Sequence, residues 1–326
     1  MPNSFGRYAY NGHYMKLHFA SLLLCVLPIT AYSAPQIPQQ SAVPGGTIEV
    51  NVRLVNVLTS VEDRTGAPYG GLQKEDFRLT EDGEVQKVAV FEKQSELPLS
   101  IVMAMDTSMS TRKDLPLEVA SARRFTRAIL RPVDAVAVFQ FSTFVSQVQG
   151  FTSDARSVEQ ALSHLKTGVA TALYDAIYLS AEALEKRKGR KVIVLITDGG
   201  DTSSKTNYAE ALRAAQIAEA MIFSIIMVPI QADAGRDTGG EHALMQLSED
   251  TGGRYFYASS ITQLDEAFRR ISDELRTQYL LAYYPNRKVG AEFRRIHLEL
   301  TPAALERHGR SLKLRYRTGY YNSKIE

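Results

Sequence analysis

Small oxygen-bearing side chains gather directly after an apolar run that is typical of a buried strand. Residues 101–105 are apolar, Asp106 follows them, and the next turn carries Ser108 and Ser110. One carboxylate with nearby hydroxyl groups suits a hard divalent cation, above all Mg²⁺, with Mn²⁺ or Ca²⁺ as alternatives. Because Ser-rich turns after strands are common, this segment alone is a weak indication of a metal site.

Two later segments strengthen the prediction of a metal site. Thr171 opens a helical stretch, and Asp198 follows a second apolar run at residues 192–196. In a doubly wound sheet, ligands bind at the carboxyl ends of the strands, near the point where the strand order reverses. We therefore expect Asp106 and Asp198 at the same edge of the sheet, with Thr171 arriving from a third loop.

Each segment also has a local interpretation that needs no metal. Ser108 and Ser110 could cap a helix that begins near residue 114, and Asp198 could cap the turn at Gly199 and Gly200. The ordered set of three segments favours the metal site, because the context of a motif is what confirms it.

Together these residues resemble the metal-ion-dependent adhesion site of the von Willebrand factor type A domain family. That site is an Asp-x-Ser-x-Ser motif, then a loop Thr, then the Asp of a Thr-Asp-Gly, and all five positions are matched in order. The resemblance covers roughly residues 98–275. It implies Ser108, Ser110 and Thr171 as direct or nearly direct ligands, and Asp106 and Asp198 as acids that act largely through water.

The same resemblance implies a partner and a setting. The last coordination position would be filled by a carboxylate of a protein or peptide partner. With its flanking segments, the layout also resembles a family of secreted bacterial proteins called VWFA-related. Asp201, Asp237 and Glu241 could form an acidic rim around the site, and the alternative for them is solvated loop acids. The six histidines show no zinc-ligand spacing.

The elements that must position this site follow from the hydrophobic pattern. Continuous apolar runs separated by helical stretches predict a doubly wound, mostly parallel α/β sheet covered on both faces. Strands are expected at 101–105, 135–141, 192–196, 221–228 and 254–258, and helices near 114–130, 157–165, 171–187, 207–220 and 261–275. Residues 145–148 follow 135–141 too closely for a crossover, so they should form an antiparallel edge hairpin.

Strand character also flanks the α/β region. Residues 47–97 are predicted to form a small β module, with a period-two strand at 48–54 and a hairpin around Asp82 and Gly83. Residues 276–326 contain further short strands, which would be marginal alone. We therefore expect them to pack with the N-terminal module, so that the α/β domain at 98–275 is inserted into a β platform.

The N-terminus has the order of a secretory signal. Lys16 precedes the apolar stretch 19–29, and Ala31 and Ser33 supply small residues before a cleavage site. We expect a signal peptide at 1–33, with Met15 as an alternative start, and a flexible leader at 34–46. The stretch is too short to favour a membrane span. The mature protein is then secreted or periplasmic, with an uncleaved signal acting as an anchor as the alternative.

Charge and composition narrow the function classes. The chain has 38 basic and 36 acidic residues. Two of the basic residues and none of the acidic ones lie in residues 1–33, so the remainder of the chain has 36 of each and a formal net charge of zero. This balance argues against a nucleic-acid binder. The favoured function is a non-catalytic, metal-dependent binding module. The alternatives are a metal-dependent hydrolase and a structural envelope protein with a non-functional site.

Overall fold

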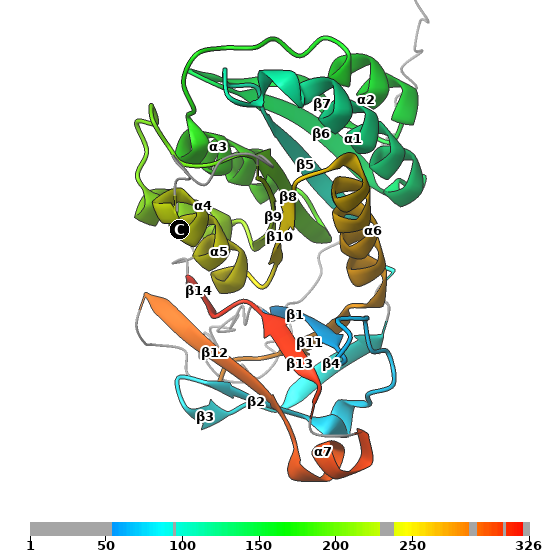
Figure 1. Ribbon diagram of the computed structural model, residues 1–326. Coiled ribbons are helices and arrows are strands. Elements are labelled where there is room, and N and C mark those ends of the chain that lie inside the picture. Colours follow the sequence, from blue (N-terminus) through cyan, green and yellow to red (C-terminus); the bar gives the residue numbers. More distant parts are fainter. Residues whose placement is uncertain (1–53, 94–95, 229–237, 287–291, 309–310, 322–326) are drawn as a thin grey trace, which may run out of the picture. The chain divides into compact units, whose positions relative to one another are not determined.

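The computed structural model describes residues 54–93, 96–228, 238–286, 292–308 and 311–321 (Figure 1). The expected signal peptide, the leader, residues 48–53 of the strand expected at 48–54, and Asp237 lie outside these residues. Within the described ranges, no helix is both long enough and apolar enough to cross a lipid bilayer.

The α/β region is built on a six-stranded sheet in the order β10-β9-β8-β5-β6-β7. Its strands are β5 (Leu99–Asp106), β6 (Ala135–Phe141), β7 (Val145–Thr152), β8 (Arg190–Thr197), β9 (Ala220–Met227) and β10 (Arg254–Ala258). All neighbours are parallel except β7, which pairs antiparallel with β6. This confirms the predicted fold class and the antiparallel edge hairpin.

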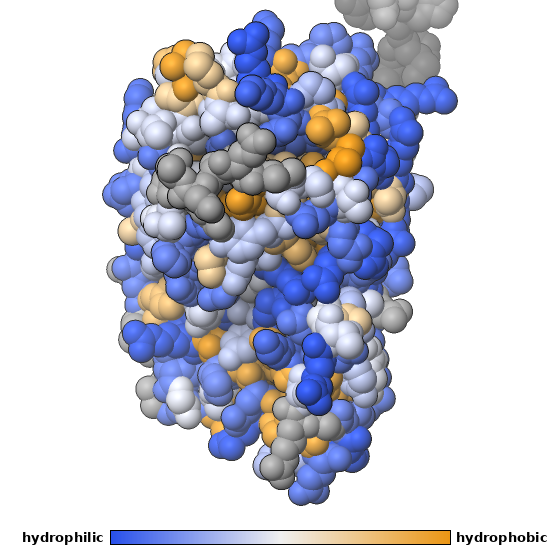
Figure 2. Space-filling model, viewed as in Figure 1, coloured by the Kyte–Doolittle hydropathy of each residue, from blue (hydrophilic) through white to orange (hydrophobic). Residues whose placement is uncertain are grey.

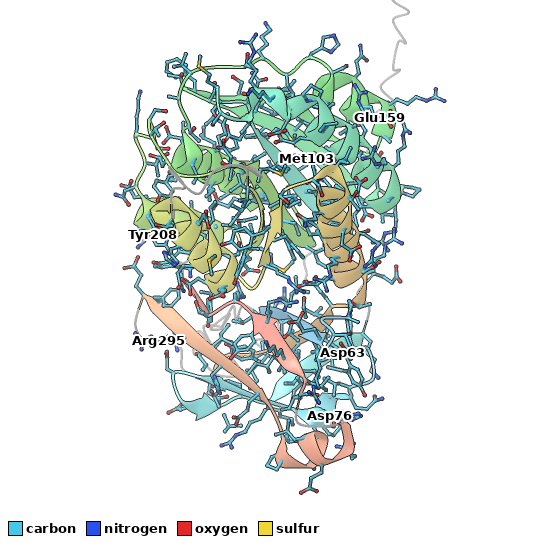
Figure 3. All side chains as sticks on the ribbon, in the orientation of Figure 1. Asp63, Asp76, Met103, Glu159, Tyr208 and Arg295 are labelled. Carbon is cyan, nitrogen blue, oxygen red and sulfur yellow. The ribbon has the colours of Figure 1, made fainter. Side chains whose placement is uncertain are left out.

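Helices cover both faces of this sheet, because its strands present apolar side chains on both sides. One face carries α1 (Leu115–Ile129), α2 (Ala155–Leu162) and α6 (Ile261–Thr277), and the other carries α3 (Leu173–Glu185), α4 (Tyr208–Ile217) and α5 (Thr238–Asp250) (Figure 1). Every residue of β5 is buried. Met103, labelled in Figure 3, packs into the first layer, while Val102 and Ala104 pack into the second.

One expectation about this region was wrong. The segment 237–241 was expected as an acidic loop, but from Thr238 onward the chain is the first turn of α5. Gly239 and Gly240 have low helix propensity, which hides the helix in the sequence. Burial of Leu244 and Leu247 against β9 and β10 supplies the stability instead.

The flanking segments form two four-stranded sheets with orders β13-β1-β11-β4 and β14-β12-β2-β3. Their elements are β1 (Val55–Glu62), η1 (Lys74–Asp76), β2 (Phe77–Glu81), β3 (Glu84–Val85), β4 (Val88–Lys93), β11 (Tyr279–Tyr283), β12 (Phe293–Leu300), α7 (Pro302–His308), β13 (Lys313–Tyr316) and β14 (Gly319–Tyr321). Strands from before and after the α/β region pair directly, as in β1 with β11 and β2 with β12. Val57, Leu79 and Leu281 belong to one common core, and we call this unit the β platform.

The hairpin around Asp82 and Gly83 is shorter than the sequence suggested. Both residues have positive φ, 48° and 84°, and they join β2 to the two-residue strand β3. After the turn, β3 ends at Val85 and β4 begins at Val88, so that residues 86 and 87 belong to neither strand. The chain changes sheets there, and β4 pairs with β11.

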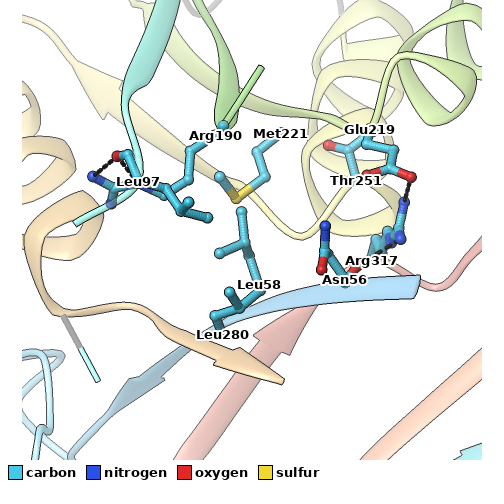
Figure 4. Close-up of a pocket in the computed structure, with 10 residues that line it drawn as sticks. Asn56, Leu58, Leu97, Arg190, Glu219, Met221, Thr251, Leu280 and Arg317 are labelled. Atoms are coloured by element: carbon cyan, nitrogen blue, oxygen red, sulfur yellow. Dashed lines mark hydrogen bonds and ion pairs between the residues drawn. The ribbon is translucent and has the colours of Figure 1, made fainter. Parts of the chain in front are cut away.

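Buried ion pairs join the β platform to the amino-end side of the α/β sheet. Glu62 of β1 pairs with Arg254 (2.7 Å) and Arg315 (2.8 Å), and Arg315 also pairs with Glu274 of α6 (2.9 Å). A cavity of about 40 Å³ lies nearby (Figure 4). Beside it, the Arg190 side chain donates a hydrogen bond to the Leu97 carbonyl, and Arg317 forms an ion pair with Glu219. Such a volume holds at most one or two waters, so it is part of the packing between the two parts.

Candidate metal site

Asp106 lies at the point of the sheet where the strand order reverses. From β5 the chain continues to β6 and β7 on one side, while β8, β9 and β10 extend on the other. Asp106 ends β5 and is fully buried. The backbone N–H of Ser108 donates to Asp106 Oδ1 (2.8 Å), and the Thr197 hydroxyl donates to Oδ2 (2.6 Å). These two bonds fix the carboxylate between the ends of β5 and β8.

The two serines and Asp198 meet beside this carboxylate. The hydroxyl oxygens of Ser108 and Ser110 are 3.0 Å apart, and the Ser110 side chain hydrogen-bonds Asp198. Ser110 precedes the short helix η2 (Thr111–Lys113) but makes no capping hydrogen bond with its side chain. The Gly199 N–H is bound by Thr197 rather than by Asp198. The hydroxyls therefore converge on a shared point and do not cap the local turns.

Thr171 comes from the loop that precedes α3 and is buried. Its loop adjoins the Asp106 loop, because the Gly168 N–H donates to the Thr107 carbonyl (2.8 Å). Thr202 holds the Thr171 backbone from the other side, accepting from its N–H at 2.8 Å. Among the described residues, no hydrogen bond links the Thr171 side chain to the other four predicted ligands.

The acids at this edge have raised pKa values. Burial, reinforced by the charge of Asp198, raises the pKa of Asp106 to about 6, although hydrogen bonds from Thr197 and Ser108 partly oppose this. Burial also raises the pKa of Asp198, with Asp114 adding repulsion. Raised values mean that the site destabilises its own negative charge, which a bound cation would reverse.

Glu118 is an acid at this edge that the sequence motif does not contain. It lies in the first turn of α1 and is only 1% exposed. Burial, followed by the charges of Asp106, Asp114 and Asp198, raises its pKa to about 8. Ser110, Asp114, Glu118 and Asp198 share the lining of one cavity of about 550 Å³, whose other walls include Leu117, Ile261 and Leu264.

The predicted rim acids lie in different surroundings. Asp201 accepts from the backbone N–H of Leu173 (2.8 Å) and from Ser204, so it caps the start of α3. Glu241 is buried in α5 and accepts from the hydroxyl of Tyr257 (3.0 Å). Neither lines the cavity beside Asp198.

Supporting hydroxyls complete the local geometry. Thr111 donates to the carbonyls of Asp106 and Ser108, both at 3.1 Å, and so fixes the loop between them. Thr197 belongs to the Thr-Asp-Gly motif, so its position was visible in the sequence. Thr111, Thr202 and Glu118 had no comparable signal, because single polar residues near a motif are usually solvated.

The donor set fits a hard cation better than a soft one. Ser108 and Ser110 supply neutral oxygens, and Asp106 and Asp198 supply charge beside them. In the part of the chain that the structure describes, no three His, Cys, Asp or Glu side chains are grouped closely enough to hold a metal. Hence a site here would depend on hydroxyls and water, with two acids at most acting directly.

These features define a doubly wound α/β domain with an oxygen-rich site at its switch point. Residues 101–201 match the family model of the von Willebrand factor type A domain. The chain therefore carries a von Willebrand factor type A domain, and the matched segment contains all five predicted ligands. No curated protein matches the chain.

Solved structures of such domains are similar to this chain. BatB from Bacteroides thetaiotaomicron is 20% identical, with 55% of this chain and 100% of that chain covered and a TM-score of 0.45. A von Willebrand factor type A protein from Catenulispora acidiphila is 12% identical, with coverages of 78% and 71% and a TM-score of 0.48. The corresponding domain of the type V pili tip protein Mfa5 from Porphyromonas gingivalis is 15% identical, with coverages of 54% and 94% and a TM-score of 0.44.

Proposed function

We propose that this protein is a non-catalytic binding module whose site takes Mg²⁺ or Mn²⁺. Asp106, Ser108, Ser110, Thr171 and Asp198 would hold the ion. A carboxylate of a protein or peptide partner would complete its coordination. The signal-like residues 1–33 support a secreted or periplasmic setting for this activity.

The observation that carries the proposal is a group of acidic side chains with no basic side chain among them. The described residues that line the cavity include Asp114, Glu118 and Asp198, and none of them is Lys, Arg or His. Asp106 lies fully buried beside them. Of these acids, Asp106 and Glu118 are buried, whereas Asp198 is half-buried and Asp114 is exposed. Keeping the two buried carboxylates ionised without a cation costs on the order of several kcal/mol each. A divalent cation would offset this cost.

The proposed coordination favours an acidic partner. If Ser108, Ser110 and Thr171 are the direct ligands, their neutral oxygens leave most of the ion's positive charge uncompensated. An ion in that state attracts a further anionic oxygen, which a partner carboxylate supplies. Metal and partner would then bind cooperatively.

Apolar side chains around the site support a macromolecular partner. Met109, Phe144 and Val169 are 59%, 74% and 74% exposed. They lie on the loop after β5, on the turn between β6 and β7, and on the loop before α3, which are in contact with one another. Although the face in Figure 2 is mostly hydrophilic, with apolar groups in small patches, these three gather on the loops of the site. Clustered exposed apolar side chains mark interaction surfaces.

Calorimetry with the chain from residue 34 onward tests the metal. We expect one Mg²⁺ or Mn²⁺ to bind weakly, in the millimolar range that few direct carboxylates would give, and Asp106→Ala to abolish the heat. Equal binding by Asp106→Ala, or no binding by the unaltered protein at millimolar metal, would contradict the proposal.

Capture of partners from an envelope extract, with and without EDTA, tests the recognition. We expect capture to require metal and to weaken in Thr171→Ala. Val169→Ser should weaken capture without changing metal affinity. Val133→Ser is the matched control, because Val133 is 59% exposed but precedes β6 at the opposite edge of the sheet. Capture that survives both EDTA and Thr171→Ala would place recognition elsewhere.

A further inference from the structure

Glu118 is a buried acid whose burial the fold does not explain. Its residue is 1% exposed, and neither carboxylate oxygen has a hydrogen-bond partner among the described residues. An acid in the first turn of a helix interacts favourably with the helix dipole, by about 0.3–1 kcal/mol. That gain is available to an exposed side chain too, and it is smaller than the cost of burying an unpaired carboxylate.

The surroundings of Glu118 are those of the proposed metal site. It shares a cavity lining with Ser110 and Asp198, and the charges of Asp106, Asp114 and Asp198 all act on it. Its position therefore increases the local excess of negative charge instead of reducing it. An ionised Glu118 is stable there only when a cation or a hydrogen-bonding water lies within reach of the carboxylate.

We propose that Glu118 is a further member of the metal site, acting from outside direct coordination through its charge and a metal-bound water. This inference rests on the proposed function. Outside coordination follows from the described residues, where no three acidic, His or Cys side chains are grouped to hold an ion. Glu118 is thus a positioning residue: it would orient a water ligand and add negative charge that strengthens binding of the cation.

The proposal predicts opposite effects of one substitution with and without metal. Glu118→Gln removes charge and keeps the shape of the side chain. Without metal, it should leave the melting temperature unchanged or raise it, because burial disfavours the charged form of Glu118 and Gln carries no charge. With saturating Mg²⁺, the metal-induced rise in melting temperature should be smaller than in the unaltered protein. A purely packing role would instead lower stability equally in both conditions.

Titration calorimetry with Mn²⁺, together with melting curves with and without Mg²⁺, tests the proposal on the chain from residue 34 onward. We expect Glu118→Gln to weaken Mn²⁺ binding about tenfold, as outer groups of metal sites do. Glu182→Gln on the exposed face of α3 is the control and should bind as the unaltered protein does. Glu118→Met provides a second, uncharged variant of similar length.

The outcomes separate this inference from the proposed function. If Asp106→Ala abolishes binding while Glu118→Gln and Glu118→Met bind normally, the Glu118 proposal is overturned and the proposed function stands. If the unaltered protein binds no metal, both fail. If both Glu118 variants fail to fold without metal, Glu118 has a structural role and the proposal is overturned.

Discussion

The junction with the β platform and the carboxyl edge of the α/β sheet both bury carboxylates, and they surround them in opposite ways. At the junction with the β platform, Glu62 and Glu274 are each paired with Arg315, and Glu62 also with Arg254. At the carboxyl edge of the sheet, Asp106 and Glu118 are equally buried, but the described lining of the adjacent cavity contains no basic side chain. At the junction, arginines of the same chain neutralise the buried acids, whereas no basic side chain lines the cavity at the carboxyl edge.

This difference separates a structural use of buried charge from a binding use. A paired carboxylate contributes to a fixed interface, and its removal disrupts that interface. An unpaired one raises the free energy of the folded state, and the cation that we propose would offset this cost when it binds. Measurements that perturb each region in turn should therefore give effects of opposite sign.

The largest effect is expected at the junction. Arg315→Met leaves Glu62 and Glu274 with less compensation and should lower the free energy of unfolding by about 3–5 kcal/mol, with or without metal. Denaturant titration measures it. Arg124→Met is the matched control, because its pair with Asp265 is on the surface (side chains 49% and 41% exposed) and should cost less than about 1 kcal/mol. Similar losses for the two variants would remove the distinction drawn between the regions.

At the carboxyl edge, Asp106→Asn should have the opposite sign. Because burial raises the pKa of Asp106 to about 6, its charged form costs more free energy than that of an ordinary aspartate, although it still predominates at pH 7. Without metal, the variant should therefore be more stable than the unaltered protein, by up to about 2 kcal/mol. Melting curves with added Mg²⁺ should then show no further rise. A marked loss of stability without metal would show that the carboxylate is structurally required.

Asp134, a buried carboxylate at the amino edge of the sheet, extends the comparison, because its contribution to stability should depend on pH. Burial raises the pKa of Asp134, but hydrogen bonds from Arg131 and from the Leu99 N–H (2.9 Å) outweigh it and hold the pKa below the usual 3.8. Its stabilisation is therefore present above pH 3.8 and is lost as pH falls below that value.

Asp134→Asn should thus cost about 1–2 kcal/mol at pH 7 and less at pH 3. Denaturant titrations at the two pH values measure the difference. A cost that is independent of pH would indicate lost packing or geometry, and would remove Asp134 from the class of carboxylates stabilised by their partners.

The smallest effect on stability is expected for Ser110→Ala. Ser110 is exposed, and its hydroxyl contacts only Ser108 and Asp198 within the described part of the chain. We expect a change of less than about 0.5 kcal/mol in stability but a clear loss of Mn²⁺ affinity by calorimetry. Unchanged affinity would remove Ser110 from the proposed ligands.

Much of the α/β fold was predictable because its signals are long. Buried parallel strands give continuous apolar runs, and β5, β6, β8 and β9 all lie where such runs were found. Helix α5 was missed because its first turn holds two glycines and its stability comes from packing. The β platform was harder, since strands such as β3 and β14 have two and three residues, too few to show a period.

Some residues of the candidate site were predictable from the sequence, and others could be identified only from the fold. Asp106, Ser108, Ser110 and Asp198 were found because their types and spacing form a motif, and the structure links them by hydrogen bonds or proximity. Glu118 lies eight residues beyond Ser110, the last residue of the nearest motif, so only its burial and lack of a partner identify it. Asp201 looked similar in the sequence, yet its hydrogen bonds to the start of α3 could be known only from the fold.

The pairing of β4 with β11 has a consequence for how the binding domain is attached. Lys93, at the end of β4, lies opposite Tyr279, at the start of β11, in an antiparallel pair. In topological terms the two strands are a hairpin, and the whole of residues 94–278 is its loop. Because entry and exit lie side by side, a short turn could replace the domain and still close the platform. Tension from a captured partner would then reach the platform through these two neighbouring strands and through the ion pairs of the junction beside them.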